Sequence, residues 1–322
     1  MNGRFVGGIA VIVAAGVLVY WIAAHNKPVA AISADVASHR MPDKSVAADH
    51  KPSGYSKLPS MELPLQSTIA TLIQRADQGD AEAACRLALE YQKCDEVEKQ
   101  VMSIDDLSRG GEVENVVATV SIGSDSSSFY SGVEHCAGVQ PPAPGRVAEL
   151  LRRSASNGNP AAMRAYATGA GFSYDSLLEE IDELRAYKTL GPQVARSAIQ
   201  DGDGTVLLSL AAAHQPETHL FAKPLLAQAV SIDVVEALAL FEVARSELAT
   251  QARTEGSMWD HVNRQMANLE ARASSEQKAK SARRANAIRA SIRRPIRMPS
   301  DNKAALVSRA SAGPLRPVEC VS

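Results

Sequence analysis

The fold of this chain is decided by the stretch GDAEAACRLA at residues 79–88, which recurs twice further along the sequence. The second copy reads GNPAAMRAYA at residues 158–167, and the third reads GDGTVLLSLA at residues 202–211. Aligned without gaps, the copies share a Gly, then Asp or Asn, a small apolar residue in the middle, and Leu or Tyr followed by Ala. We interpret the pattern as the turn and second helix of a repeated helix pair.

The first two residues of each copy have clear structural roles. Glycine tolerates the left-handed conformation of the residue that follows a helix, and an Asp or Asn side chain caps the next helix by accepting backbone N–H bonds. We therefore predict that each glycine ends a helix and that each Asp or Asn begins one. The predicted turn residues are Gly79, Asp80, Gly158, Asn159, Gly202 and Asp203.

The spacing of the copies predicts a helical-repeat domain over residues 64–255. Helix-pair arrays repeat every 34–47 residues or so, and the second and third copies are 44 residues apart. The first two copies are 79 residues apart, which leaves room for an acidic insertion at 95–140. A further helix is expected from Asp233 to Thr250. The fold class is thus all-α, an α-solenoid of antiparallel helix pairs.

The first copy and its flanks resemble the Sel-one-like repeat family, a relative of the tetratricopeptide repeats. The residues that match the family's repeat are Ala76, Gly79, Asp80, Ala83, Leu87, Ala88 and Tyr91, with Ala88 in the place of a glycine. The resemblance implies an α-solenoid that binds protein partners and carries out no catalysis.

Four cysteines suggest disulfides. Cys85 and Cys94 would lie about 13 Å apart along one helix, which is too far for a bridge. We expect Cys94 to pair with Cys136 across the insertion, with Cys85–Cys136 as the alternative. A zinc site from Cys85, Cys94, His135 and Cys136 is disfavoured, because zinc ligands usually come in closely spaced pairs. No metal and no cofactor are predicted.

The N-terminus has the composition of a membrane anchor. Residues 5–24 carry no charge, and about 20 apolar residues suffice to cross a bilayer. We favour an uncleaved transmembrane helix within residues 1–24 over a cleaved signal sequence. A proline-containing linker at 25–63 would follow, and residues 25–322 are predicted to lie in the periplasm, attached to the inner membrane. The alternative is a secreted or periplasmic protein after signal cleavage.

A helix predicted over residues 173–190 has an acidic side. We expect Leu178 and Ile181 to point inward, and Glu179 and Glu180 to be exposed. An acidic face of this kind is usually only solvated, so no site is assigned to it.

The C-terminal residues 256–322 are predicted to form a basic tail, helical over 256–292. Residues 271–322 contain twelve Lys or Arg and three acids. A solvated, partly disordered tail is the first interpretation, and contact with anionic lipid headgroups is the second. Binding to nucleic acid is not expected, because no aromatic residue for base stacking follows Trp259.

Taken together, the sequence predicts a non-catalytic interaction or scaffold protein of the bacterial cell envelope, with an unidentified protein partner. The alternatives are an envelope hydrolase whose site is not recognisable in the sequence, and a structural spacer with a lipid-binding tail. No paired carboxylates, nucleophile motif or phosphate-binding loop supports the enzyme.

Overall fold

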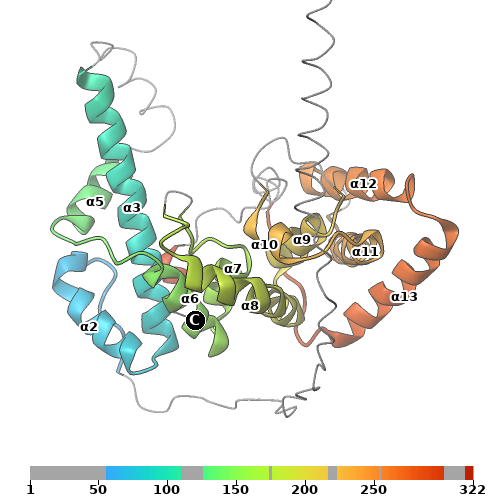
Figure 1. The fold of residues 1–322 in the computed structure, drawn as a ribbon, viewed down its shortest axis with the longest axis horizontal. Helices are drawn as coiled ribbons and strands as arrows, with labels where there is room; N and C mark the ends of the chain where they lie inside the picture. Colours follow the sequence, from blue (N-terminus) through green and yellow to red (C-terminus); the bar gives the residue numbers. More distant parts are fainter. Residues whose placement is uncertain are drawn as a thin grey trace, which may run out of the picture. The chain divides into compact units, whose positions relative to one another are not determined.

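The structure is a computed structural model that describes residues 56–109, 126–173, 176–216, 223–253, 255–300 and 316–321, all within the compact unit Pro52–Ser322 (Figure 1). These residues form eleven α-helices and no strand, so the predicted all-α class is confirmed for them. In chain order the helices are α2 (Leu65–Asp77), α3 (Ala81–Arg109), α5 (Ser126–Cys136), α6 (Arg146–Ser156), α7 (Pro160–Ala167), α8 (Ile181–Gln200), α9 (Gly204–Ala213), α10 (Leu225–Ala229), α11 (Val234–Thr250), α12 (Ser257–Glu270) and α13 (Ser275–Ser291). A 3-10 helix, η2, spans Pro317–Cys320.

The three repeat turns have the same backbone geometry. Gly79, Gly158 and Gly202 have φ angles of 92°, 81° and 89°, in the left-handed region that glycine adopts without strain. At each turn the glycine N–H donates to the carbonyl three residues back, and the next N–H donates to the carbonyl five residues back, over 2.9–3.2 Å. This pair of hydrogen bonds satisfies carbonyls at the end of the first helix.

The residue after each glycine caps the second helix with its side chain. Asp80 accepts from the amides of the second and third residues beyond it at 3.0 and 3.2 Å, and Asp203 does the same at 2.9 and 3.0 Å. Asn159 accepts from the amide of Ala162 at 3.0 Å. Helices α3, α7 and α9 therefore begin where the repeat pattern predicts.

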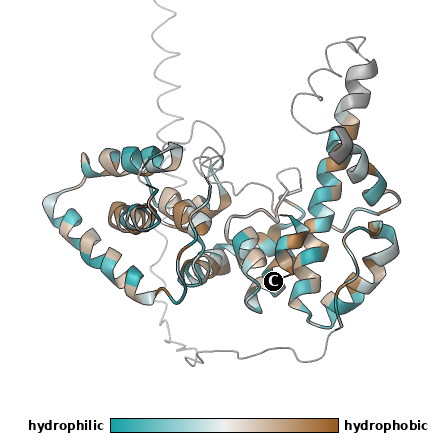
Figure 2. Cartoon of the chain, turned by 180° about the vertical axis from the view of Figure 1, so that it is seen from behind, coloured by the Kyte–Doolittle hydropathy of each residue, from teal (hydrophilic) through white to brown (hydrophobic). Residues whose placement is uncertain are grey.

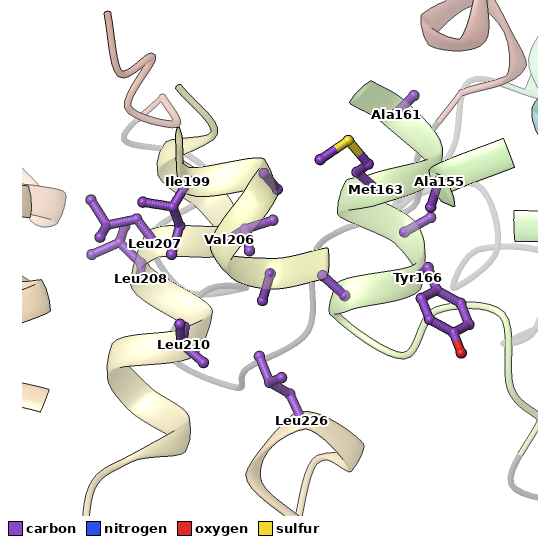
Figure 3. Packing of buried hydrophobic residues seen from close by; sticks show 14 of the residues in the cluster. Ala155, Ala161, Met163, Tyr166, Ile199, Val206, Leu207, Leu208, Leu210 and Leu226 are labelled. Atoms are coloured by element: carbon purple, nitrogen blue, oxygen red, sulfur yellow. The ribbon is translucent and has the colours of Figure 1, made fainter. Parts of the chain in front are cut away.

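The core runs through helices that touch their neighbours in sequence. Contacts join α2 to α3, α3 to α6, and then α6, α7, α8 and α9 in order, while α11 packs on α9, α12 and α13. Figure 3 shows Val206, Leu207, Leu208 and Leu210 of α9 among side chains of α7, α8 and α10. Most of α9 and α11 is buried, and both helices are largely hydrophobic in Figure 2.

Two elements differ from the sequence prediction in their bounds. Helix α3 continues to Arg109, so the first part of the predicted insertion is an extension of the repeat helix. Helix α8 begins only at Ile181 and runs through Pro192 to Gln200. Because residues 176–180 form turns, the helical face predicted there does not exist. Leu178 is 86% exposed and Ile181 is 45% exposed, whereas Glu180 is buried.

The single helix expected over residues 256–292 is instead two helices. Ser274 separates α12 from α13 with a capping box, in which its hydroxyl accepts from the amide of Gln277 and the Gln277 side chain accepts from the Ser274 amide. Helix α13 packs against α11, with Ala285 and Ile288 buried. This part of the predicted tail therefore belongs to the folded domain.

The chain then returns along the repeat turns through a segment that we call the C-terminal strap, residues 292–300 and 316–321. Arg293 and Arg297 donate backbone N–H bonds to the carbonyls of Gln200 and Gly202 at 2.7 and 2.8 Å, and the Gly204 amide donates to the Arg297 carbonyl. Further along, η2 contacts α3 and α7. The strap thus meets the third repeat turn first and the earlier copies afterwards.

The predicted anchor at residues 5–24 and most of the predicted linker at 25–63 lie outside the described residues. Among the helices that are described, none is both long enough and apolar enough to span a bilayer.

Candidate functional site

A cleft of 980 Å³ lies between α3, α5, the proline-containing loop at 137–145, and residues 170–173 and 176, which follow α7. Its long wall is α3, where residues from Tyr91 to Met102 line it. The Gln92 side chain donates to the carbonyl of Ala170, which connects this wall to the opposite one. The cleft is concave and partly apolar, and it is a candidate binding site.

A disulfide and a hydrogen bond hold α5 beside α3. Cys94 is joined to Cys136 with their Cα atoms 5.4 Å apart, which is the pairing that the sequence favoured. Next to it, Nε2 of His135 lies 2.8 Å from Oε2 of Glu90. A Cβ atom on Gly132 would lie 3.0 Å from a methyl group of Val97, so α5 approaches α3 closely where they line the cleft.

Glu90 is also part of a buried charge cluster beneath this wall. Its other carboxylate oxygen lies 3.5 Å from Nε of Arg86, and both residues are only 1% exposed. Arg86 donates as well to the carbonyls of Pro59 and Ser60. Buried charges persist when they are paired and hydrogen-bonded, so the cluster ties α3, α5 and the chain that enters the domain into one framework.

The lining of the cleft combines apolar walls with exposed hydrophobic groups at its edge. Val101, Met102 and Val133 are 41%, 56% and 36% exposed. Phe172 forms part of the opposite wall, and its ring packs edge-on against Tyr187 at 5.2 Å between centroids. The Tyr187 hydroxyl donates to the Ala167 carbonyl, which fixes the ring that supports Phe172.

Charged groups of the lining are mostly acidic. Asp95, Glu96 and Glu98 lie on α3, where Lys99 is the one basic lining residue and pairs with Asp95 at 2.9 Å. The pKa of Glu96 is raised, because partial burial removes water from its carboxyl and because Asp95 beside it is negative.

Glu180, in the turn that precedes α8, is one of the residues that line the cleft. The residue is 5% exposed, and one carboxylate oxygen accepts a hydrogen bond from the Ser176 hydroxyl at 2.6 Å. The other oxygen, Oε2, is buried and has no hydrogen-bond partner among the described residues. The sequence placed this side chain on a solvated face. The polar run at 173–176 just before it was the available signal that a turn, and not a helix, precedes Ile181.

The predicted turn residues do not line the cleft. Besides capping their helices, they contact arginines and the strap. Asp80 pairs with Arg75, the Asn159 amide donates to the carbonyl of Cys320 at 2.9 Å, and Asp203 accepts from Nε of Arg164 at 2.6 Å. Arg164 also pairs with Glu319 of η2 at 2.9 Å. The second and third turns therefore hold the end of the chain, whereas the first turn contacts Arg75 of α2.

The alternative pairing Cys85–Cys136 is wrong. Cys85 is joined to Cys320 of the strap, with 5.6 Å between their Cα atoms, and both residues are fully buried. Sequence reasoning missed this bridge because it set Cys320 in a solvated tail. The pairs also exclude these cysteines as thiolate ligands of zinc. In the described part of the chain, no three His, Cys, Asp or Glu side chains are grouped so as to hold a metal ion.

The site thus consists of an apolar cleft with an acidic edge and one buried carboxylate. Among its lining residues, side-chain hydrogen bonds join the Ser176 hydroxyl to the Glu180 carboxylate and Lys99 to Asp95. Comparison with known proteins adds no family: no protein-family model, curated protein or solved structure matches the chain.

Proposed function

We propose that the chain is a non-catalytic interaction or scaffold protein, built as an α-solenoid of Sel-one-like helix pairs. The observation that carries the proposal is the succession of three turns with the same backbone hydrogen bonds, which join helices that pack in sequence order. Arrays of this kind expose extended surfaces that bind other proteins. The cleft between α3 and α5 is the candidate surface for a ligand.

The proposed location is the periplasmic side of a bacterial inner membrane, with residues 5–24 as anchor. Two disulfides support an oxidising compartment.

For the basic region at 271–322, a protein partner is favoured over anionic lipid. Arg284, Arg289 and Arg293 form ion pairs with carboxylates of other helices or turns, and Lys280 pairs with Glu276 of its own helix, so part of the charge of the basic region is already neutralised.

Site-specific photo-crosslinking in intact cells of the source bacterium tests the proposal. A photoreactive amino acid replaces Met102 at the cleft, Leu63 before α2 or Ile232 before α11, each of which is exposed. Membranes are solubilised after irradiation and the chain is purified. We expect one abundant protein crosslinked at one of these positions and absent without irradiation.

If none of the three positions gives a specific crosslink, the scaffold function is contradicted and a structural spacer is favoured.

The location of the protein is tested separately with a membrane-impermeant thiol reagent on the reduced and non-reduced protein. Free thiols in all four cysteines before reduction would contradict the exported location.

A further inference from the structure

Glu180 carries a carboxylate oxygen for which the described residues supply no donor. Oε1 is occupied by the Ser176 hydroxyl at 2.6 Å, whereas Oε2 is buried without a partner. A buried polar atom without a hydrogen bond destabilises the fold, and it does so more strongly when the group is charged. A ligand that brings a donor into the cleft would relieve that destabilisation.

We propose that the cleft binds a peptide segment of a partner protein through a lysine or arginine side chain, whose cation contacts Oε2 of Glu180. The inference rests on the proposed function and assigns a ligand class to its cleft. Ammonium and guanidinium groups are donors only, which suits an oxygen that can only accept when ionised.

Charge around the cleft favours the same ligand. Its lining contains the carboxylates of Asp95, Glu96, Glu98 and Glu180 against the single ammonium of Lys99. Lys99 is engaged with Asp95 on the same helix. An acidic lining attracts a basic segment and repels an acidic one, which supplies selectivity as well as binding.

The apolar walls explain why a peptide fits better than a small amine. Lysine and arginine carry long aliphatic stems that pack along apolar surface while the head group remains polar. The stem can lie against walls such as Phe172 and Val147. Exposed Val101, Met102 and Val133 provide further apolar contacts for neighbouring residues of the peptide. The volume of 980 Å³ is far larger than one side chain requires.

The test uses four fluorescein-labelled octapeptide pools that differ only in one fixed central residue: lysine, arginine, norleucine or glutamate. Their binding to the full-length chain in detergent is measured by fluorescence anisotropy. Because a hydrogen bond to a charged group contributes about 1.5–3 kcal/mol, the lysine and arginine pools should bind about tenfold or more tightly than the norleucine pool. Equal binding of the lysine and norleucine pools would overturn the inference.

Matched variants assign the effect to the residue. Glu180→Gln should lower the affinity of the lysine pool to that of the norleucine pool. Glu179→Gln removes an exposed carboxylate next to Glu180 and should leave the affinity of the lysine pool unchanged. Met102→Ser should weaken all pools and preserve their ratio, and it tests the wall even if Glu180→Gln fails to fold. Equal losses in Glu179→Gln and Glu180→Gln would contradict a specific role for Glu180.

Failure of this inference is distinguishable from failure of the proposed function. If no pool binds but photo-crosslinking captures one partner, the scaffold stands and the ligand class is wrong. If no pool binds and no partner is captured at any position, both are wrong.

Discussion

Ala252 closes helix α11 in the left-handed conformation that glycine adopts after α2, α6, α7 and α8. Its φ is 54°, the one positive value among described residues other than glycine. Its N–H donates to the carbonyl of Ala249 and the next N–H donates to that of Leu248, the same bonds as in the repeat turns. For alanine the left-handed conformation costs about 1–2 kcal/mol.

Replacing this alanine by glycine should stabilise the protein. Ala252→Gly removes the cost of the left-handed conformation. It also destabilises the folded state by about 0.5–1 kcal/mol, because glycine is more flexible in the unfolded chain and loses more entropy on folding. We expect a net gain of about 0.5–1 kcal/mol in the free energy of unfolding, measured by urea denaturation. The matched control is Ala249→Gly, the same change within the last turn of α11, which should destabilise. A loss of stability in both variants would contradict the role of φ at residue 252.

Residue-scale predictions from sequence succeeded where local backbone chemistry decides. The Gly of each turn ends one helix and the Asp or Asn caps the next. Both roles depend only on neighbouring residues in the chain, so they could be predicted from the three copies. The exposure of Leu178 and the burial of Glu180 depend on where α8 begins. Both residues lie in the turn at 176–180, where side chains do not follow the helical period. Sequence periodicity cannot reveal a contact made by a cleft wall.

At the scale of elements, the third turn differs from the first two because the strap lies on it. A Cβ atom on Gly204 would approach the Arg297 carbonyl oxygen to 2.6 Å, and Gly202 has a similar conflict with the Pro295 carbonyl at 2.5 Å. The first and second turn glycines have nothing within 4 Å. The first helical residue is Ala81 in α3 and Pro160 in α7, but Gly204 in α9.

Gly204→Ala should therefore detach the strap from the third turn. Alanine suits the first position of a helix, so the expected loss of about 1–3 kcal/mol comes from overpacking against residues 297 and 298. Hydrogen exchange should show faster exchange of the Arg297 amide, which bonds to the Gly202 carbonyl.

The control is Ala81→Gly at the equivalent position of the first copy, which changes helix propensity alone. Unchanged protection of the Arg297 amide in Gly204→Ala would show that the strap does not depend on this contact.

Element boundaries were predictable wherever a cap is encoded. The capping box at Ser274 and Gln277 was present in the sequence and would have divided the expected 256–292 helix into α12 and α13. The extension of α3 to Arg109 has no such signal. That helix is held by the disulfide and by the packing of α5, which are long-range contacts.

At the scale of the whole molecule, the two disulfides close loops of very different length. Cys85 and Cys320 are 235 residues apart, and Cys94 and Cys136 are 42 apart. The sequence favoured the shorter bridge because both partners flank one insertion. The longer one depends on a strap that packs on the third turn and, further along, on α7 and α3, and no local pattern records these contacts.

Removing the longer bridge should cost more stability than removing the shorter one. In the chain-entropy model the difference between Cys85→Ala/Cys320→Ala and Cys94→Ala/Cys136→Ala is about 1.5 kcal/mol, because loop-closure entropy grows with the logarithm of length. Urea denaturation of both double variants measures it. A greater loss in the shorter-bridge variant would show that the α3–α5 contact, and not closure of the chain, dominates.

The bridge between α3 and η2 also decides how the protein responds to tension. A pull applied between the segment before α2 and the C-terminal residue would pass from Cys85 directly to Cys320. Helices α6 to α13 lie between these cysteines in the chain and would bear none of the load. About 800 Å of extensible polypeptide is thereby withheld, at roughly 3.4 Å for each residue. The oxidised domain would behave under force as a short, stiff link, and reduction would convert it into a long, compliant one.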